Sequence, residues 1–437
     1  MTSGFFTRRL ALLAAVSSAL LLAACGGGDK KDSGGQSNLR AINLTTDLAS
    51  VDLYTGDTKR FSALTADAMA ASTGLETGTY TLAVKRAGET ATLYSESFAL
   101  AKDRHYSAVI TGRESSLVVR TIPENEDTAG IAAANFKLRV FNLTADTGGV
   151  DVYVTLPTVD IDASPVPTLR FTNNSLSDFL PFETANTYRL RVTGTGNSRD
   201  VRLDIPLSGV VVKQYHTLVL TSGPGGALMN AALIPQSGTA SILKNTKARV
   251  RVAAGVDGAA NVSASVNAVT IVAQLRSPGV MADYELVNAG TQDLTVLVNG
   301  TTVSTGNRTF AAGADYTVLA SGSAVTTQVQ MLTDDNRLPA TSTQAKVRLV
   351  NGVAGSAPMT VSLDFKKLLS DVAAGTASTY YTAASTGSAR LEVSTLNDFL
   401  FATTAVSGQP LLKGQGVYTV FMLGGQAAPA GFLRQDR

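Results

Sequence analysis

The stretch Leu39-Arg40-Ala41-Ile42-Asn43 begins a pattern that recurs three more times in the chain. Related stretches start at Leu138, Val250 and Val347, at intervals of 97 to 112 residues, and each has an arginine as its second residue. A second shared stretch closes every copy, beginning at Tyr106, His216, Tyr316 and Tyr418. Self-similarity at a nearly fixed period is typical of chains built from tandem modules. The sequence therefore predicts four copies of one domain.

The copies have the pattern of β-strands. Val201-Arg202-Leu203-Asp204-Ile205 alternates apolar and charged residues, which buries one face of a strand and wets the other. Asn299-Gly300 stands between two alternating segments, the strongest short signal for a two-residue hairpin. The sequence has no convincing long amphipathic helix. We therefore predict an all-β protein of four tandem antiparallel β-sandwich modules, immunoglobulin-like or transthyretin-like.

Residues 1–24 have the composition of a signal peptide. Arg8 and Arg9 precede an apolar run, residues 10–22, whose helical rise of about 20 Å is shorter than the roughly 30 Å hydrocarbon core. Leu22, Ala23 and Ala24 followed by Cys25 resemble the lipobox of bacterial lipoproteins, and Cys25 is the single cysteine of the chain. The resemblance implies a lipid on the sulfur of Cys25. The alternative is an ordinary secretory signal with a chance cysteine at its end.

This N-terminus predicts a location in the bacterial cell envelope. In the proteobacterial sorting rule a residue other than aspartate after the lipidated cysteine permits transfer to the outer membrane, and Gly26 meets that condition. We expect the protein to contact the membrane through its N-terminal lipid and to face the periplasm or the cell surface. More than one acyl chain is needed for stable anchoring, and the lipoprotein resemblance implies three.

The chain divides into a leader, a tether and four modules. Residues 1–24 are predicted to be the lipoprotein signal peptide, and residues 25–38 the lipidated cysteine and a flexible tether rich in glycine, serine and charge. The predicted modules span residues 39–122, 137–235, 247–333 and 346–437. Short linkers with proline and acidic residues join them. With modules about 35 Å across, four in line would form a rod of about 140 Å.

Three features of the copies resemble a known domain. We call the first shared stretch of each copy the head and the closing stretch the tail. The head bears an arginine and ends in asparagine, and the tail has the pattern Tyr-Thr-Val. Together with a Val-Asp-x-Tyr segment at residues 51–54 and 150–153, they are similar to a repeat domain of unknown function in bacterial lipoproteins and surface proteins. The resemblance covers nearly all of residues 39–425. Copy three departs from it, with Ala254 for the asparagine and Ser263 for the aspartate, and copy four has Ser362 at the aspartate position. The resemblance implies an architecture and no established chemistry.

Residues suited to catalysis are few. The two histidines, His105 and His216, fall at the start of the same final strand in copies one and two, so we interpret them as strand-end aromatic residues. Asp52 and Asp151 recur at one place but lie in separate modules, so they are expected to face solvent or bind a turn rather than form a catalytic pair. The sequence has neither a nucleophile elbow nor a phosphate-binding loop. We expect no enzyme activity and no cofactor.

Acidic clusters provide a weaker hypothesis of calcium binding. Asp160 with Asp162, and Asp334 with Asp335 at a module junction, could supply oxygen ligands. None has the spacing of a calcium-binding loop, so we predict solvated acids and no metal site. The 36 basic and 34 acidic residues give a formal net charge of +2, which provides no field for nucleic acid.

These patterns favour a non-enzymatic, lipid-anchored envelope protein that acts as a structural spacer or adhesion rod. Its expected partners are proteins or glycans of the envelope or of a host surface, and not nucleic acid. The alternative is a periplasmic or surface lipoprotein that binds a carbohydrate or protein ligand. Copy two, with an insertion at residues 156–182, is the copy expected to carry such a site.

Overall fold

The computed structural model describes residues 35–437 except 145, 164–165, 185, 386–388 and 407–408. The signal segment, Cys25 and most of the predicted tether lie outside the described residues. The regular secondary structure of the described chain is β-strand throughout except for one short 3₁₀ helix, η1 (Thr128–Gly130), between the first two modules. None of its helices has the length and apolar character needed to cross a membrane. The predicted all-β fold of tandem sandwiches is confirmed.

Each module contains two sheets. Module 1 comprises β1 (Gln36–Thr45), β2 (Ser50–Thr55), β3 (Thr58–Thr65), β4 (Thr73–Glu76), β5 (Gly78–Arg86), β6 (Thr92–Leu100), β7 (His105–Arg113) and β8 (Ser116–Pro123). Module 2 comprises β9 (Asn135–Asn142), β10 (Val150–Thr155), β11 (Leu169–Phe171), β12 (Ser175–Leu176), β13 (Leu180–Glu183), β14 (Arg189–Gly194), β15 (Asn197–Pro206), β16 (Tyr215–Ser222), β17 (Met229–Pro235) and β18 (Ser241–Leu243).

The second half of the chain repeats the same plan. Module 3 comprises β19 (Lys247–Val256), β20 (Asn261–Val266), β21 (Val269–Arg276), β22 (Gly279–Val280), β23 (Glu285–Asn288), β24 (Gly290–Val298), β25 (Thr301–Phe310), β26 (Asp315–Gly322) and β27 (Gln328–Asp334). Module 4 comprises β28 (Gln344–Val353), β29 (Met359–Leu363), β30 (Lys366–Val372), β31 (Thr376–Ala377), β32 (Tyr381–Ala384), β33 (Arg390–Ser394), β34 (Phe399–Thr404), β35 (Val417–Gly424) and β36 (Ala430–Gln435).

The four modules share one strand order. The sheets of module 1 run β4-β1-β7-β8 and β3-β2-β5-β6, and β1 pairs with β7 in parallel. The other head strands, β9, β19 and β28, likewise pair in parallel with β16, β26 and β35. In an immunoglobulin domain the first strand neighbours the second in one sheet, whereas here these two strands lie in different sheets. Of the two kinds of sandwich expected, this strand order excludes the immunoglobulin-like one and leaves the transthyretin-like one.

The recurrent asparagine of the head connects the two sheets. Asn43, Asn142 and Asn351 are fully buried, and each side-chain amide donates to a backbone carbonyl at the end of the module's third strand, at 3.0 to 3.1 Å. The Oδ1 atoms accept backbone N–H groups two residues further on. In module 3, where alanine replaces the asparagine, Ser277 Oγ lies 3.1 Å from the carbonyl oxygen of Ala254, to which it donates.

The predicted hairpin at Asn299-Gly300 is present. Strands β24 and β25 pair up to Val298 and Thr301, so the loop contains two residues. Asn299 has a φ of 49° and Gly300 a φ of 83°. Positive values at both positions are what a primed turn requires, and asparagine and glycine adopt them at the lowest cost.

Head-bearing sheets pack against each other in pairs. The face of β1 and β7 away from the core of module 1 meets the same face of module 2, burying Ile42, Leu44, Val109, Ile122, Phe141, Leu143, Val219, Ala232 and Ile234. Modules 3 and 4 meet in the same way through Ala253, Val280, Leu319, Val350, Phe421 and Leu423. The head strands are therefore buried on both faces, and for this reason they read as apolar runs rather than as alternating strands.

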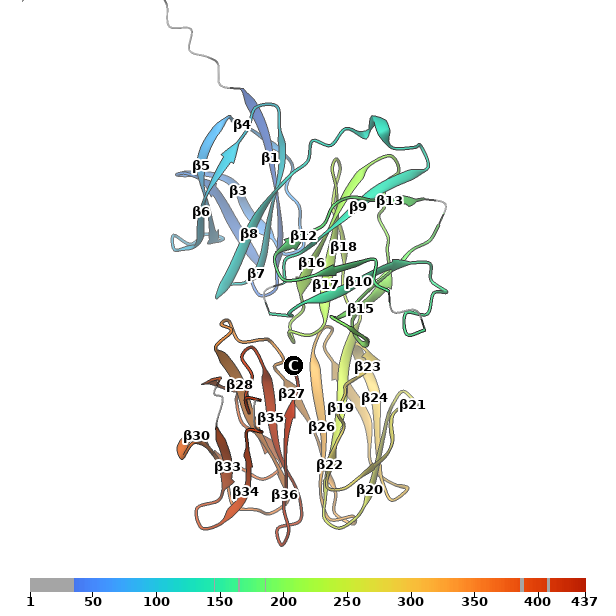
Figure 1. The fold of residues 1–437 in the computed structure, drawn as a ribbon, viewed down its shortest axis with the longest axis vertical. Helices are drawn as coiled ribbons and strands as arrows, with labels where there is room; N and C mark the ends of the chain where they lie inside the picture. Colours follow the sequence, from blue (N-terminus) through green and yellow to red (C-terminus); the bar gives the residue numbers. More distant parts are fainter. Residues whose placement is uncertain (1–34, 145, 164–165, 185, 386–388, 407–408) are drawn as a thin grey trace, which may run out of the picture.

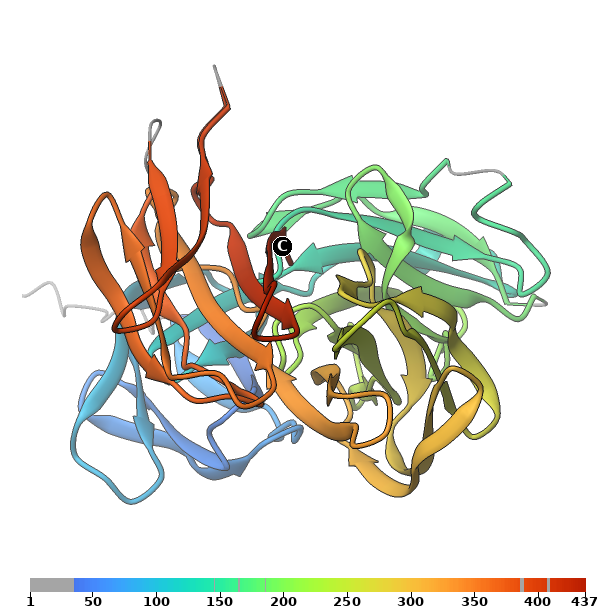
Figure 2. The same ribbon diagram turned by 90° about the horizontal axis from the view of Figure 1, so that it is seen from below.

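The predicted line of four modules is wrong. Modules 1 and 2 lie side by side, modules 3 and 4 lie side by side, and one pair is stacked on the other (Figure 1). Seen along the long axis, the two pairs cross (Figure 2). Apolar burial between neighbouring sheets favours this compact arrangement over a rod, because each exposed head sheet would otherwise leave an apolar face in water. The boundaries differ slightly from those expected, since β1 begins at Gln36, within the predicted tether, and β18 lies in the predicted linker after residue 235.

Small-angle scattering distinguishes the two arrangements in solution. For a compact chain of about 400 residues the expected radius of gyration is about 21 Å, whereas a uniform rod of about 140 Å has one of about 40 Å. We expect a value nearer the lower figure, raised somewhat by the tether. A measured value near 40 Å would contradict the paired arrangement.

Candidate functional site

The arginine of each head strand points to the face where modules meet. Arg40, Arg139, Arg251 and Arg348 are only 8%, 8%, 1% and 1% exposed. The parallel register places each opposite a hydroxyl residue of the partner strand. Their Nε atoms donate over 2.8 to 3.1 Å to the hydroxyl groups of Ser107, Thr217, Thr317 and Thr419. Sequence reasoning did not assign a role to these arginines, although their recurrence in all four heads was a signal for one.

An acidic residue completes this arrangement in three modules. Glu124, Asp334 and Asp436 stand at the end of the last strand and accept hydrogen bonds from Ser107, Thr317 and Thr419. Module 2 has Gln236 at the equivalent place, directly after β17. We call the arginines, hydroxyl residues and these four end residues the interface network.

In the pair of modules 3 and 4 the interface network crosses between modules. Arg251 Nη1 of module 3 lies 2.5 Å from Asp436 Oδ1 of module 4. Arg348 of module 4 forms an ion pair with Asp334 of module 3 and donates to the carbonyl oxygen of Thr333 at 3.1 Å. Tyr284 Oη donates to Asp334 at 2.7 Å, so the carboxylate is bonded from several sides. All four charged side chains are no more than 1% exposed.

The charged form of Asp334 is favoured despite its burial. Burial raises the pKa of the Asp334 carboxyl, but Arg348 and Arg251 outweigh this effect and the pKa lies below its ordinary value. In the pair of modules 1 and 2 the balance is reversed, since burial raises the pKa of Glu124 in spite of Arg40. Arg40 there also donates to the carbonyl oxygen of Pro235 in module 2, over 2.5 Å.

Asp334 and Asp335, which were candidates for calcium binding, are occupied by cationic side chains. Asp335 accepts hydrogen bonds from Arg337 at 2.6 Å and lies 2.9 Å from Lys346 Nζ. Burial raises the pKa of Asp335, but the bonds from Arg337 and Lys346 bring it to about 2. Asp334 and Asp335 therefore offer no open set of oxygen ligands, because protein cations already satisfy them.

The other candidate acids, Asp160 and Asp162, lie in an exposed turn. The carboxylate of Asp160 accepts the backbone N–H of Asp162 at 2.9 Å, and Asp162 accepts from the Ser198 hydroxyl at 2.5 Å. Across the described ranges, no three or more His, Cys, Asp or Glu side chains gather in a way that could hold a metal ion.

The aromatic residue at the start of each tail accepts one specific hydrogen bond. The phenolic oxygens of Tyr106, Tyr316 and Tyr418 accept the backbone N–H of the residue five positions earlier, at 3.3, 2.9 and 2.8 Å. His216 takes the same place in module 2, where its Nε2 accepts from Val211 N–H at 3.0 Å. Burial lowers the pKa of His216 to about 4, so the ring stays neutral and able to accept. His105 is exposed and takes no part.

Asp52 and Asp151 bind turns. Both are 1% exposed, which rules out a position facing solvent. Asp52 accepts the backbone N–H groups of Ala63 and Gly88, at 2.7 and 3.2 Å, and Asp151 accepts that of Gly196 at 2.9 Å. Of the two positions expected for these residues, the turn-binding one is correct.

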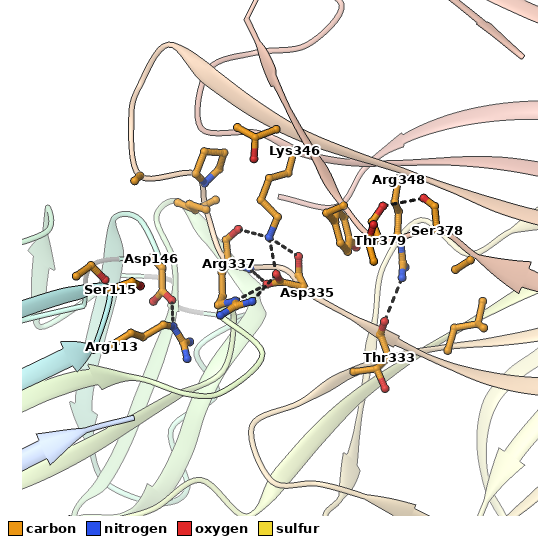
Figure 3. Close-up of a pocket in the computed structure, with 18 of the residues that line it drawn as sticks. Arg113, Ser115, Asp146, Thr333, Asp335, Arg337, Lys346, Arg348, Ser378 and Thr379 are labelled. Carbon is orange, nitrogen blue, oxygen red and sulfur yellow. Dashed lines mark hydrogen bonds and ion pairs between the residues drawn. The ribbon is translucent and has the colours of Figure 1, made fainter. Parts of the chain in front are cut away.

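A cleft of about 1140 Å³ lies where the two module pairs meet, and we call it the junction cleft. It is bordered by the β7–β8 hairpin of module 1, by Asp146 of module 2, by β27 and the linker after it, and by the β31–β32 edge of module 4 (Figure 3). None of the described residues in the 156–182 insertion lines it, so module 2 contributes little. This cleft is therefore not the site expected in copy two.

The charges in the junction cleft are paired with one another. Arg113 Nε donates to Asp146 Oδ2 at 2.9 Å on one side. On the other, Asp335 pairs with Arg337 and Lys346, and burial lowers the pKa of Lys346 below its ordinary value (Figure 3). Hydroxyl side chains fill the space between these pairs, namely Ser115, Ser116, Thr333, Thr376, Ser378, Thr379 and Thr382. This donor and acceptor set suits a polar ligand and contains no nucleophile–base pair of the kind that catalysis requires.

Replacing Asp334 with asparagine tests the interface network. The change leaves Arg251 and Arg348 buried with half of their negative charge removed, and breaking a buried ion pair typically costs about 3–5 kcal/mol. We expect the free energy of unfolding, measured by urea denaturation, to fall by about that amount. The matched control Asp160→Asn, in an exposed turn, should change it by less than about 0.5 kcal/mol. Equal effects of the two substitutions would contradict a role of the network in stability.

Replacing His216 with tyrosine tests its role as a neutral acceptor. The pKa of His216 is about 4 in the folded chain against 6.5 unfolded, so the unfolded state binds more protons between these values and stability falls as the pH drops. For this residue the loss between pH 7 and pH 5 is about 2 kcal/mol. His216→Tyr should remove that part of the pH dependence while keeping the hydrogen bond. The control His105→Gln should retain it, and an unchanged profile in His216→Tyr would contradict the assignment.

Comparisons with known proteins place the modules in a family. A solved structure titled "The Bacillus anthracis TIE protein" is 9% identical, with 95% of this chain and 73% of that chain covered, at a TM-score of 0.13 that does not indicate a shared fold. No curated protein matches the chain. The family model described as "Domain of unknown function (DUF4397)" matches residues 37–153 and 248–352, together just over half of the sequence. With a match of that extent over the repeated modules described above, the chain belongs to the DUF4397 family of domains of unknown function.

Proposed function

We propose that this protein is a non-enzymatic, lipid-anchored protein of the bacterial cell envelope, in which two module pairs form one rigid block that carries interaction surfaces away from the membrane. Cys25 is the anchor, and the tether connects it to β1. In Figure 1 the described chain enters at the top of module 1, so modules 3 and 4 extend away from the tether along the long axis. The block replaces the rod expected from the sequence as the spacer.

The observation that carries the proposal is the burial of ion pairs between modules. Within each pair, the interface network and the apolar face resist hinge motion. Separating the modules would break the hydrogen bonds and ion pairs of the buried arginines and expose apolar surface to water. A rigid body suits a spacer or an adhesion platform, since it presents its loops in fixed positions.

A second set of contacts holds one pair to the other. Arg249 and Asp315 form two hydrogen bonds of 2.8 Å, and Arg249 Nη1 also lies 3.4 Å from Asp200 of module 2. Backbone bonds join Gly225 to Gly313 and Asn336 to Gly225, each at 3.0 Å. These bonds link module 2, module 3 and the linker to module 4 into one junction.

Apolar side chains exposed at loops of modules 3 and 4 provide possible contact points for a partner. Val325, between β26 and β27, is 93% exposed, and Leu396, between β33 and β34, is 96% exposed. Loops held by a rigid scaffold often carry binding residues. Val325 and Leu396 support contact with an envelope or host protein.

The second candidate function is that of a ligand-binding lipoprotein. The junction cleft favours it, because ligand sites form preferentially between domains and combine apolar walls with a few placed polar groups. The two functions are compatible, since an anchored block can carry a ligand site.

The anchor is tested by replacing Cys25 with serine. We expect the wild-type protein to incorporate a radiolabelled fatty acid and to sediment with membranes, and the Cys25→Ser protein to do neither. Ser33→Ala in the tether is the matched control and should behave as wild type.

Adhesion of cells to matrix-coated and glycan-coated wells should fall in both a deletion strain and the Cys25→Ser strain. Acyl labelling that survives in Cys25→Ser would refute the anchor, and unchanged adhesion in the deletion strain would refute the adhesion role.

A further inference from the structure

We propose that the junction cleft binds an oligosaccharide, whose hydroxyl groups bond to Asp146, Arg113 and Arg337 and whose rings lie across the apolar linker after β27. This inference rests on the ligand-binding function proposed above and names its ligand class and residues. The cleft is built from all four modules or their linkers, so it exists only in the assembled block.

The polar groups of the cleft match the chemistry of a sugar. A sugar hydroxyl both donates and accepts, so it bonds best where donors and acceptors alternate. Asp146 lines the cleft with a side chain that is 13% exposed, and its Oδ2 accepts from Arg113 Nε at 2.9 Å. Its Oδ1 is closed to solvent, so Oδ2 is the carboxylate oxygen to which a ligand hydroxyl can donate.

Donors line the cleft beside this acceptor. Arg113 donates to Asp146 through Nε and to the carbonyl oxygen of Gly223 through Nη2, so Nη1 is the nitrogen available to a ligand. Arg337 donates to Asp335 through Nε and Nη2, so its Nη1 is likewise available to a ligand. Ser115 and Thr379, on opposite walls, add exposed hydroxyl groups (Figure 3).

The pairing of charges argues for a polyol rather than a strongly anionic ligand. The ammonium group of Lys346 already donates to the Asp335 carboxylate and to the carbonyl oxygens of Asp335 and Arg337, at 2.9, 3.0 and 3.0 Å, so its three protons are used. Arg348 is likewise committed to Asp334, Thr333 and Thr419. An incoming phosphate or carboxylate would find only the Nη1 groups of Arg113 and Arg337 and would be repelled by the carboxylates of Asp146 and Asp335 beside them, whereas a neutral hydroxyl is not repelled.

The volume and the apolar walls of the cleft also suit an oligosaccharide. Its volume of about 1140 Å³ is slightly above the range of ordinary small-molecule sites, which leaves room for several sugar rings. Leu338, Pro339 and Ala340 form an apolar strip against which the C–H faces of the rings can pack. The ring of Tyr380 also lines the cleft but is stacked by Lys346 and Arg348, at 4.7 and 4.9 Å from its centroid, so the apolar strip is the surface for the sugar rings.

The neighbouring sheet edge is unsuited to a peptide. A peptide that adds as a strand needs a continuous edge of free backbone groups. Here the edge strand is divided into β31, of two residues, and β32, of four, with Ser378, Thr379 and Tyr380 between them. Ser378 N–H is already bonded to the carbonyl oxygen of Leu349 at 2.8 Å. The edge therefore offers too short a ladder for strand addition.

Binding of the mature, detergent-solubilised protein to an array of neutral and acidic oligosaccharides tests the inference, with affinities of the retained sugars measured by calorimetry. Ser115→Trp and Thr379→Trp place bulk in the cleft from opposite walls and should each weaken binding at least tenfold. Thr379→Val removes a hydroxyl group at nearly constant volume and should weaken it several-fold. Ser95→Trp, on the exposed face of β6 in module 1, is the matched control and should bind as wild type.

All the altered side chains are exposed, so we expect every variant to keep the fold. Thermal unfolding of each variant checks this. Sugar binding that persists in both cleft tryptophan variants would overturn the cleft as the site, and failure to retain any arrayed sugar would overturn the ligand class. The same protein is also tested on a peptide array. Retention of a peptide but of no sugar, lost in the same variants, would overturn the saccharide and leave the ligand-binding function standing. None of these results bears on acyl labelling of Cys25, so the anchored block is judged separately.

Discussion

The structure depends on one buried guanidinium group in each module. The parallel pairing of head and tail strands places an arginine beside a hydroxyl group on a face that a single sandwich would expose. A guanidinium has five N–H donors, and the hydroxyl satisfies only one of them. The remaining donors reach the acid at the end of the last strand and the carbonyl groups of the neighbouring module. Burying the apolar head sheet against a second module thus becomes compatible with burying the charge.

The two module pairs differ in the groups that bond their buried arginines. In modules 3 and 4 two aspartates face two arginines, and the charged side chains are almost completely sealed from water. In modules 1 and 2 Gln236 stands where the fourth acid would be, Glu124 has a raised pKa, and the arginines rely more on backbone carbonyl groups such as Pro235 and Pro123. The junction cleft is bordered by the fully charged pair, through Arg348 and β27. Part of its wall is therefore held by the buried ion pairs of this interface, which favours a preorganised site.

Much of the fold could be predicted because it is encoded locally. Period-two alternation, the Asn-Gly turn and the repeated heads and tails identify the strands and the four modules without reference to neighbours. The arrangement of the modules could not be predicted in this way, because it depends on which apolar face of a strand meets another module. The head strand was apolar on both faces in the sequence, which was the available sign of a second interface. The cleft could not be predicted either, since Asp146, Arg337 and Thr379 come from three modules or linkers and share no spacing.

Each region of the family match extends beyond one sandwich into the next module. Its first region, residues 37–153, covers module 1 and continues through η1 and β9 into β10, and its second, residues 248–352, covers module 3 and continues into β28. Each match therefore contains one sandwich and the head strand of its partner. That added strand carries Arg139 or Arg348, which donates across the pair to Pro123 or Thr333. The segment that recurs thus carries both arginines of an interface, whereas several of their partners, namely Thr217, Pro235, Thr419 and Asp436, lie in the rest of the second module. The pair of modules, rather than the single sandwich, is therefore the unit in which the arginines find their partners.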